Sequence, residues 1–354
     1  MTISNPATAT TASSADTSST PPAQIDLRGT WTALITPFRD GEVDEQALRH
    51  LVDFQIGSGT GSRTGSGTGS NVTGLVACGS TGETPTLSTD EFIRTVSIVI
   101  GQASGRVPIM VGTGSNDTAT TIVRTQLAAE LGADIALVVM PWYNRPTQEG
   151  LYQHIRHVAG QSPLPIVIYN VPGRTGCDIL APTVARLAQL PQVIGIKEAS
   201  GNVDRTSEIV HLTDPSFVVL SGDDSLTLPI MSVGGQGVIS VVANIVPQAM
   251  SALTTAALAG DFRTARGIHM ELLDLCRAMF VETNPVPVKA AAELLGICTS
   301  EVRLPLVSLD PASHAQVFQA LLDCRFTCDH LLLGEEAVRF AMSVANDFAI
   351  EAAA

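Results

Sequence analysis

The chain has 354 residues, of which 45% are hydrophobic and 15% are charged, and its formal net charge at pH 7 is −14. This composition is typical of a compact protein with a substantial core. Lysine and arginine form no cluster, which argues against a nucleic-acid-binding surface, and no apolar run approaches the roughly 20 residues that span a bilayer. We therefore expect no nucleic acid and no membrane among its partners.

The cysteines and the N-terminus point to a cytoplasmic protein. The six cysteines are scattered without CxxC spacing, which predicts reduced, mostly buried thiols, and the histidines and acidic residues form no metal-ligand constellation. The first basic residue is Arg28, so the segment before it lacks the charge of a signal or transit peptide. We expect neither a metal nor a membrane anchor.

Two segments have compositions that disfavour a packed core. Residues 1–26 are small, polar and proline-containing, which predicts a disordered N-terminal arm. Residues 57–71, GSGTGSRTGSGTGSN, have the composition of a flexible linker and interrupt an otherwise regular pattern. We interpret the second segment as a low-complexity insert.

Eight short apolar runs predict buried strands, because they are rich in Val and Ile and are bounded by Gly, Pro, Asn or Asp. Continuous apolar runs of this kind are typical of strands that are covered on both faces. In chain order they are TWTALITPF (30–38), VTGLVACG (72–79), VPIMVGTG (107–114), DIALVVMP (134–141), PIVIYNVP (165–172), VIGIKEAS (193–200), FVVLSGD (217–223) and GVISVVAN (237–244).

Helical patterns separate these runs, at 44–56, 88–103, 116–132 and 184–190, and Ser88 with Glu91 forms a predicted capping box. Eight strand–helix units favour a closed (β/α)8 TIM barrel over an open doubly wound sheet. The segment RDGEVDE after the first run also lacks the Gly-rich fingerprint of the open sheet. We place the barrel at residues 27–258, with the insert at its N-terminal face and away from catalysis.

The pattern after residue 246 is wholly helical. Predicted helices at 250–260, 262–280, 285–296 and 314–323 supply the eighth barrel helix and a C-terminal helical bundle over residues 259–323. Residues 324–354 are helix-prone, and the sequence assigns them no role.

Lys197, in the sixth predicted strand, is the most informative single residue. It is one of only two lysines, the other being Lys289, and it ends an apolar run. Active sites of such barrels lie at the C-terminal ends of the strands, and burial there lowers the pKa of an amine, which favours Schiff-base chemistry. A solvated lysine paired with Glu198 is the structural alternative, although strand alternation points Glu198 to the other face.

The other predicted strand ends carry further polar residues. The motifs GSTGE, PWYNRP and YNVPGRTG, each at the end of a predicted strand, contain hydroxyl side chains that can transfer protons. The guanidinium of Arg174, in the third motif, can bind a carboxylate with two hydrogen bonds. Each of these residues also has a purely structural interpretation. The hydroxyl residues of GSTGE can stabilise a turn, the tyrosines can be aromatic side chains at the edge of the barrel, and Arg174 can hold its own loop in place. Asp223 and Asp224 of SGDD can cap a helix. Spacing alone leaves both interpretations open.

The motifs GSTGE, PWYNRP, YNVPGRTG, IGIKEASG and LSGDD together resemble the dihydrodipicolinate synthase family of class I aldolase-type lyases. The similarity runs from about Gly29 to about Asp323. The resemblance implies a cofactor-free condensation of pyruvate, held as a Schiff base on Lys197, with L-aspartate 4-semialdehyde. The implied product is 4-hydroxy-tetrahydrodipicolinate, in diaminopimelate and lysine biosynthesis.

By the same resemblance, Tyr169 is the proton donor and acceptor, and Ser80 and Tyr143 complete a proton relay. Tyr143 would reach the site of a neighbouring subunit, as expected for a homotetramer built as a dimer of dimers.

The resemblance assigns substrate binding to three more residues. Thr81 and Ile239 would hold pyruvate, and Arg174 would bind the carboxylate of the semialdehyde. Related Schiff-base aldolases, which cleave N-acetylneuraminate or 2-keto-3-deoxygluconate, usually lack this arginine, so Arg174 favours the synthase. A noncatalytic keto-acid sensor is a second alternative.

The sequence departs from the family pattern at Ser80, where many members have threonine, although the hydroxyl remains. Larger departures affect regulation. Lysine-inhibited members carry histidines and a glutamate around an effector cavity, whereas the matching positions here, beside the retained Asn116, are Thr89, Phe92, Thr120 and Trp142. We predict weak or absent inhibition by L-lysine.

Overall fold

The computed structural model describes residues 25–57 and 72–328. The predicted N-terminal arm and insert, and the tail beyond residue 328, lie outside the described residues almost entirely, so those three predictions stay predictions.

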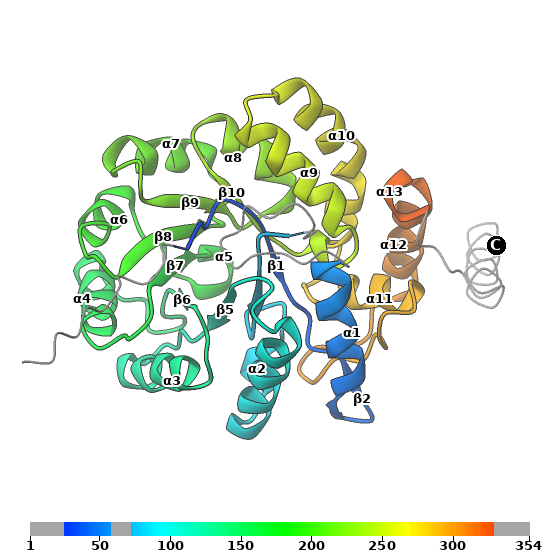
Figure 1. Ribbon diagram of the computed structural model, residues 1–354, viewed down its shortest axis with the longest axis horizontal. Coiled ribbons are helices and arrows are strands. Elements are labelled where there is room, and N and C mark those ends of the chain that lie inside the picture. The colour runs from blue at the N-terminus through cyan, green and yellow to red at the C-terminus, as the bar shows by residue number, and fades with distance from the viewer. Residues whose placement is uncertain (1–24, 58–71, 329–354) are drawn as a thin grey trace, which may run out of the picture.

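Eight parallel strands close into a barrel, which confirms the predicted TIM-barrel fold (Figure 1). Around the barrel they follow the order β1-β10-β9-β8-β7-β6-β5-β4, so each strand lies beside the next one of the chain and the last pairs with the first. The strands are β1 (Gly29–Ala33), β4 (Gly74–Ala77), β5 (Ile109–Gly112), β6 (Ile135–Val139), β7 (Ile166–Asn170), β8 (Val193–Glu198), β9 (Val218–Ser221) and β10 (Gly237–Ser240).

Helices cover the outside of the barrel. The Asp44 carboxylate caps the first of them, and the predicted capping box of Ser88 and Glu91 is present at the start of the second. The helices are α1 (Glu45–Ile56), α2 (Thr89–Ala103), α3 (Thr118–Glu130), α4 (Gln148–Ala159), α6 (Ala181–Leu187), α7 (Val203–Leu212), α8 (Thr227–Ser232) and α9 (Pro247–Leu258).

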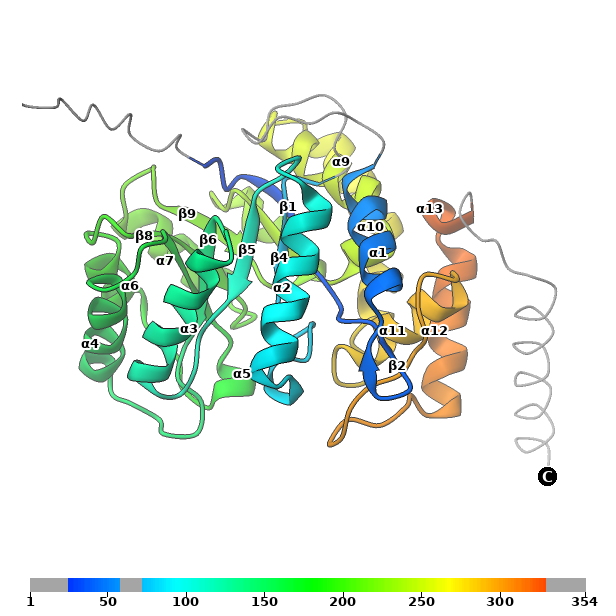
Figure 2. The ribbon, with the colours of Figure 1, turned by 60° about the horizontal axis from the view of Figure 1, so that its bottom comes forward.

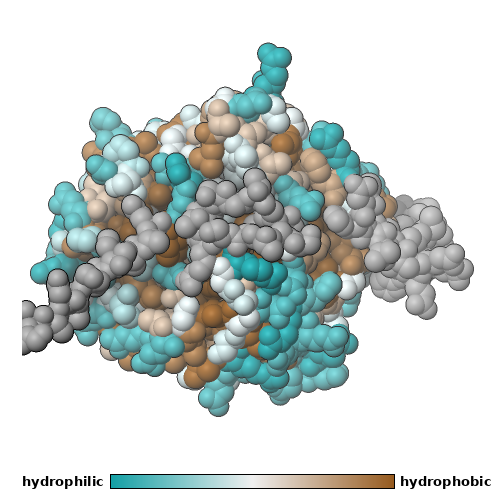
Figure 3. Space-filling model, in the orientation of Figure 1, coloured by the Kyte–Doolittle hydropathy of each residue, from teal (hydrophilic) through white to brown (hydrophobic). Residues whose placement is uncertain are grey.

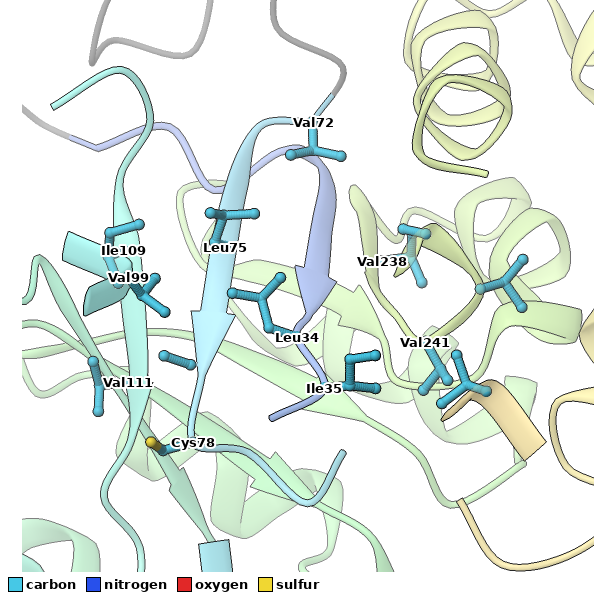
Figure 4. Packing of buried hydrophobic residues seen from close by; sticks show 14 of the residues in the cluster. Leu34, Ile35, Val72, Leu75, Cys78, Val99, Ile109, Val111, Val238 and Val241 are labelled. Atoms are coloured by element: carbon cyan, nitrogen blue, oxygen red, sulfur yellow. The ribbon is translucent and has the colours of Figure 1, made fainter. Parts of the chain in front are cut away.

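Each strand contributes to two apolar layers, because successive side chains point to opposite faces. The interior layer includes Trp31, Val76, Met110, Leu137, Val167, Tyr169, Leu220 and Ile239. The outer layer lies between strands and helices, and Figure 4 shows part of it, including Leu75, Val111 and Val238. Gly74 makes room for the interior Trp31, since a Cβ there would lie 2.4 Å from the indole.

Every strand is shorter in the structure than its apolar run, and the last and first runs differ most at their C-terminal ends. β10 ends at Ser240 because the Asp224 carboxylate accepts the backbone N–H groups of Val241 and Val242 at 2.9 and 3.1 Å. A short 3-10 helix, η3 (Val242–Asn244), follows. Continuous hydrophobicity hid this end, since both the strand and the turn are buried.

The first run also divides. β1 ends at Ala33, and a hairpin of β2 (Phe38–Arg39) and β3 (Glu42–Val43) follows it. The helix expected at 184–190 is α6, which begins earlier, at Ala181, with a proline in its first turn.

The C-terminal helices stand beside the barrel, next to α1 and α9 (Figures 1 and 2). They are α10 (Phe262–Ala278), α11 (Val286–Leu294), α12 (Pro311–Asp323) and the single turn α13 (Arg325–Cys328). α10 packs along α9 and α12, and α12 packs on α11. The helical unit therefore packs on α9, the last helix of the barrel.

The segments that follow the strand ends gather at one edge of the molecule. In Figure 2, α5 (Pro172–Thr175), which follows β7, and the β2 hairpin, which follows β1, lie at the same lower edge. This edge is the C-terminal face, where active sites of such barrels are built.

The outer surface is mixed in character. Figure 3 shows hydrophilic residues over α1 and α2, where Glu45 pairs with Arg49 and Arg94. No helix within residues 25–57 and 72–328 is both long and apolar enough to cross a lipid bilayer.

Candidate active site

Lys197 lies in the barrel interior near the end of β8. Its register partners are Tyr169 on β7 and Leu220 on β9, and its side chain is only 6% exposed. The ammonium nitrogen lies 4.3 Å from the centroid of the Tyr169 ring. The sequence interpretation of Lys197 as a surface charge is therefore wrong, and the buried interpretation is confirmed.

Burial lowers the pKa of Lys197 from its ordinary value of 10.5 to about 8. The main cause is desolvation, which disfavours the charged ammonium. The anionic Asp224 opposes this effect by stabilising the ammonium, whereas the Arg174 cation adds to it. The result is an amine with a substantial neutral population near neutral pH, as a nucleophile requires.

Tyr169 connects Lys197 to the loop after β4. Burial raises the pKa of the Tyr169 phenol above its ordinary value, so the hydroxyl keeps its proton, although Arg174 and the nearby Ser80 hydroxyl oppose this shift. Tyr169 thus places a protonated hydroxyl on the same ring that the Lys197 nitrogen contacts, and such a group can supply a proton during chemistry at that nitrogen.

The predicted substrate-binding residues lie around this group. Ile239 is 1% exposed and belongs to the same interior layer as Tyr169. Thr81 is 3% exposed, and its hydroxyl accepts a hydrogen bond from the side-chain amide of Asn284 at 3.0 Å. The exposed Arg174 donates to the main-chain oxygen of Asn284, also at 3.0 Å.

Asn284 was not predicted. It lies in the loop before α11 and joins the loop after β4 to the one after β7. Sequence reasoning assigned this region to an appended bundle, so the segment TNPVPVK gave no signal of a place at the barrel rim.

Tyr143 is the one predicted catalytic residue that stands apart from Lys197 within this chain. Its side chain is 89% exposed, and its backbone lies in the left-handed region, with φ 71°. Its N–H donates to the Thr175 carbonyl at 3.2 Å, which ties it to the segment that carries Arg174. A large exposed aromatic on a strained loop is suited to contact with a second molecule.

Glu198 faces away from the interior, as strand alternation predicted. The residue is 1% exposed, and its carboxylate accepts hydrogen bonds from the Asn170 amide at 3.1 Å and from the Ser200 N–H at 2.6 Å. Burial raises the pKa of this carboxyl. Glu198 therefore links the ends of β7 and β8 on the outer face of the barrel and is not the partner of Lys197.

The two aspartates of SGDD have different environments. Asp223 caps the 3-10 helix η2 (Asp224–Leu226), as its structural interpretation held. Asp224 instead is 2% exposed, and burial raises its pKa to about 6. At neutral pH it is mostly anionic and lies close enough to Lys197 to stabilise the ammonium.

The residues expected at an effector cavity, Thr89, Phe92, Thr120 and Trp142, carry no acidic side chain themselves. Thr89 and Thr120 are exposed, and Phe92 is 5% exposed. The main-chain oxygen of Asn116 accepts a hydrogen bond from the Asn144 amide at 2.9 Å.

Within the described parts of the chain, no three His, Cys, Asp or Glu side chains come together as metal ligands. Cys78, Cys177, Cys276 and Cys298 are buried, and burial raises the pKa of each thiol. These thiols are therefore protonated packing groups at neutral pH.

The model of the dihydrodipicolinate synthetase family matches residues 26–323. The chain belongs to this family. The match covers the barrel and the C-terminal helices together, so the resemblance seen in the five motifs is confirmed over nearly all of the described residues.

Individual members of the family are similar to this chain over nearly their full length. A 4-hydroxy-tetrahydrodipicolinate synthase from Thermomicrobium roseum is 52% identical over 313 residues, which are 88% of this chain and 100% of that protein. The crystal structure of dihydrodipicolinate synthase from Aquifex aeolicus is 44% identical, with a TM-score of 0.79, and the match covers 87% of this chain and 99% of that one.

A further structure, of the chloride-inhibited dihydrodipicolinate synthase from Acinetobacter baumannii complexed with pyruvate, is 40% identical with a TM-score of 0.79. The match covers 84% of this chain and 99% of that one. Similarity at this level extends to the whole architecture, including the helical unit.

Proposed function

We propose that this protein is a 4-hydroxy-tetrahydrodipicolinate synthase, which condenses pyruvate with L-aspartate 4-semialdehyde. One observation carries the proposal: a desolvated Lys197 amine lies at the C-terminal end of the barrel, against the ring of the buried Tyr169. The names of the relatives support the choice of substrates.

The first half of the reaction uses the neutral amine. Lys197 Nζ attacks the keto carbon of pyruvate to give a carbinolamine, and loss of water then leaves a protonated Schiff base. Tyr169 supplies the proton that the departing hydroxyl needs and is reprotonated through Ser80. The buried Asp224 carboxylate stabilises the positive charge that remains on the nitrogen.

The second half forms the carbon–carbon bond. Tyr169 accepts a proton from the methyl carbon of the Schiff base as it passes its own proton to Ser80, and the resulting enamine attacks the aldehyde carbon of the second substrate. The oxygen of that aldehyde takes up the proton as the carbon–carbon bond forms. The amino group of the second substrate then displaces Lys197 Nζ from the C=N carbon, which closes the ring and frees the lysine. The Arg174 guanidinium binds the carboxylate of that substrate. Thr81 and Ile239 hold the pyruvate portion against Lys197, one with a hydroxyl and the other with apolar surface.

A coupled assay with pyruvate and L-aspartate 4-semialdehyde tests the proposal, on the wild type and on Lys197→Ala. We expect turnover in the wild type only. Retained activity in the variant would overturn the Schiff-base mechanism. Borohydride treatment with pyruvate alone should attach a covalent adduct to Lys197 and to no other residue.

The same two assays address the alternatives. A Schiff-base aldolase for N-acetylneuraminate or 2-keto-3-deoxygluconate would trap pyruvate but leave the semialdehyde unused. A keto-acid sensor would bind pyruvate without an adduct. Arg174 is the observation that favours the synthase over the related aldolases, and the borohydride adduct separates the synthase from the sensor.

The proposed assembly is a cytoplasmic homotetramer in which Tyr143 of one subunit completes the proton relay of another. The 89% exposure of Tyr143 supports this arrangement. Mixed oligomers of Tyr143→Phe and Lys197→Ala subunits test it, since each variant alone lacks one essential group. If Tyr143 acts across the interface, the mixture regains activity, because the Tyr143→Phe subunit keeps Lys197 and receives a tyrosine from its partner. No regain would place Tyr143 in the site of its own subunit.

A further inference from the structure

The second lysine of the chain, Lys289, has no role in the proposed reaction, yet it is fully buried. It lies on α11, and its ammonium nitrogen is 2.5 Å from Glu83 Oε1. It also donates to the Glu301 carbonyl at 2.7 Å and lies 4.1 Å from the centroid of the Phe38 ring. Three partners in three directions fix the position of this cation.

Glu83 is the last residue of the GSTGE loop that carries Ser80 and Thr81. Its own N–H donates to the Ser80 carbonyl at 3.2 Å, so its backbone closes the turn that presents the serine. Its backbone has φ 53°, which only a well-determined turn maintains in a residue with a side chain. The place of Glu83 therefore determines the place of Ser80.

The second oxygen of the Glu83 carboxylate is also held by the C-terminal unit. Glu83 Oε2 accepts the N–H of Arg303 at 3.0 Å, and the Arg303 guanidinium contacts Glu91 and the Thr86 carbonyl. That guanidinium also lies 4.2 Å from the Phe38 ring centroid. Both oxygens of one buried carboxylate thus attach to residues beyond the barrel.

We propose that Lys289 is a positioning residue for catalysis, which holds the Ser80–Thr81 loop in register with Lys197 through its ion pair with Glu83. The inference rests on the proposed function, because Ser80 and Thr81 act on the substrate only in that reaction. The C-terminal helical unit is accordingly part of the catalytic apparatus.

The physical argument separates positioning from stability. A buried ion pair is expensive to desolvate, and apolar side chains of similar volume often fill such a place with no loss of stability. An apolar pair would not fix the orientation of the Glu83 side chain, whereas a carboxylate that contacts an ammonium with one oxygen and an N–H with the other has a single favourable orientation. Burial lowers the pKa of Lys289, which shows the same cost of desolvation.

The double variant Glu83→Gln/Lys289→Met tests the proposal, because it removes both charges together. Lys289→Met alone leaves the Glu83 carboxylate buried and unpaired, and we expect it to unfold at a lower temperature. In the double variant we expect the melting temperature to recover most of the way, while kcat stays at least tenfold below wild type. The rate of pyruvate trapping by borohydride should fall with kcat.

Two measurements identify the cause of such a loss. In the double variant, acylation of the Lys197 amine should proceed at the wild-type rate, because neither substitution lies on β8. Only the reaction steps that need Ser80 and Thr81 should then be slower. The control variant Asp53→Asn/Arg106→Met removes an ion pair between α1 and the loop that follows α2, at the opposite end of the barrel, and it should leave kcat unchanged.

A folded double variant with wild-type kcat and trapping rate overturns the positioning role. If the double variant does not fold, Lys289→Arg decides, because it keeps the charge but replaces a compact ammonium by a longer planar group. A wild-type kcat in that variant also overturns the role, and a loss of several-fold supports it. Wild-type protein that traps no pyruvate would overturn the proposed function itself.

Discussion

The lowered pKa of Lys197 makes a quantitative prediction about how this amine reacts with pH. A pKa of about 8, compared with 10.5 for an ordinary lysine, means that about one molecule in ten carries the neutral amine at pH 7, and not about one in three thousand. We therefore expect the reactivity of Lys197 to rise about fivefold from pH 7 to pH 8 and less than twofold from pH 8 to pH 9.

Brief acylation with acetic anhydride, followed by digestion and mass spectrometry of the peptide that carries Lys197, measures this profile. The chain suits the assay, because Lys289 is its only other lysine and is fully buried. Acylation of Lys289 would therefore report unfolding at the extremes of pH.

A variant tests whether desolvation is the cause. Leu220 is the register partner of Lys197 on β9 and belongs to the interior layer. Leu220→Ser makes room for water beside the amine and should move the midpoint upward toward 10.5, whereas the volume-conserving Leu220→Met should leave it near 8. Reactivity that rises tenfold per pH unit from 8 to 10 in the wild type would refute the reasoning.

Four further predictions concern stability, packing, the insert and regulation. Lys197→Met should raise the free energy of unfolding at pH 7 by about 3 kcal/mol, because the pKa of Lys197 is lower in the folded protein than in the unfolded chain. Calorimetry at a series of pH values should show this gain shrinking from pH 8 upward and vanishing above pH 10.5. Gly222→Ala should lower kcat more than tenfold, because its Cβ would lie 2.6 Å from Ala199 Cβ and 3.0 Å from Lys197 Cε, and an unchanged kcat would contradict the packing. Deletion of residues 58–69 should leave kcat within a few-fold of the wild-type value, because these residues connect the end of α1 to the start of β4, and both lie at the N-terminal face of the barrel, away from the active site. A large loss of kcat would place the insert at the active site. L-lysine should inhibit weakly or not at all, and an inhibition constant below millimolar would show that prediction to be wrong.

The barrel and its nucleophile could be predicted from local properties. Apolar runs bounded by turn residues gave eight strands, and alternation along VIGIKEAS separated Lys197 from Glu198. The strands follow from continuous apolar runs, and the separation of the two side chains follows from the two-residue repeat of a strand; each segment carries both properties by itself. The end of β10 escaped this reasoning, because its cause is the carboxylate of Asp224, which lies on another strand end.

The supports of the site were not predictable in the same way. Asn284 and Lys289 lie some 200 residues from the loop that carries Thr81 and Glu83, and no local pattern relates them. The interpretation of residues 259–323 as an appended bundle hid their place at the rim.

Sequence by itself determined the barrel, the residue types on its catalytic rim and the family. Tertiary structure alone decided how deeply Lys197 is desolvated, which carboxylate stabilises its charge and which helices hold the Ser80 loop. The physical reason is that hydrophobic periodicity is a local property, whereas desolvation and ion pairing depend on the side chains that the fold brings together from distant segments.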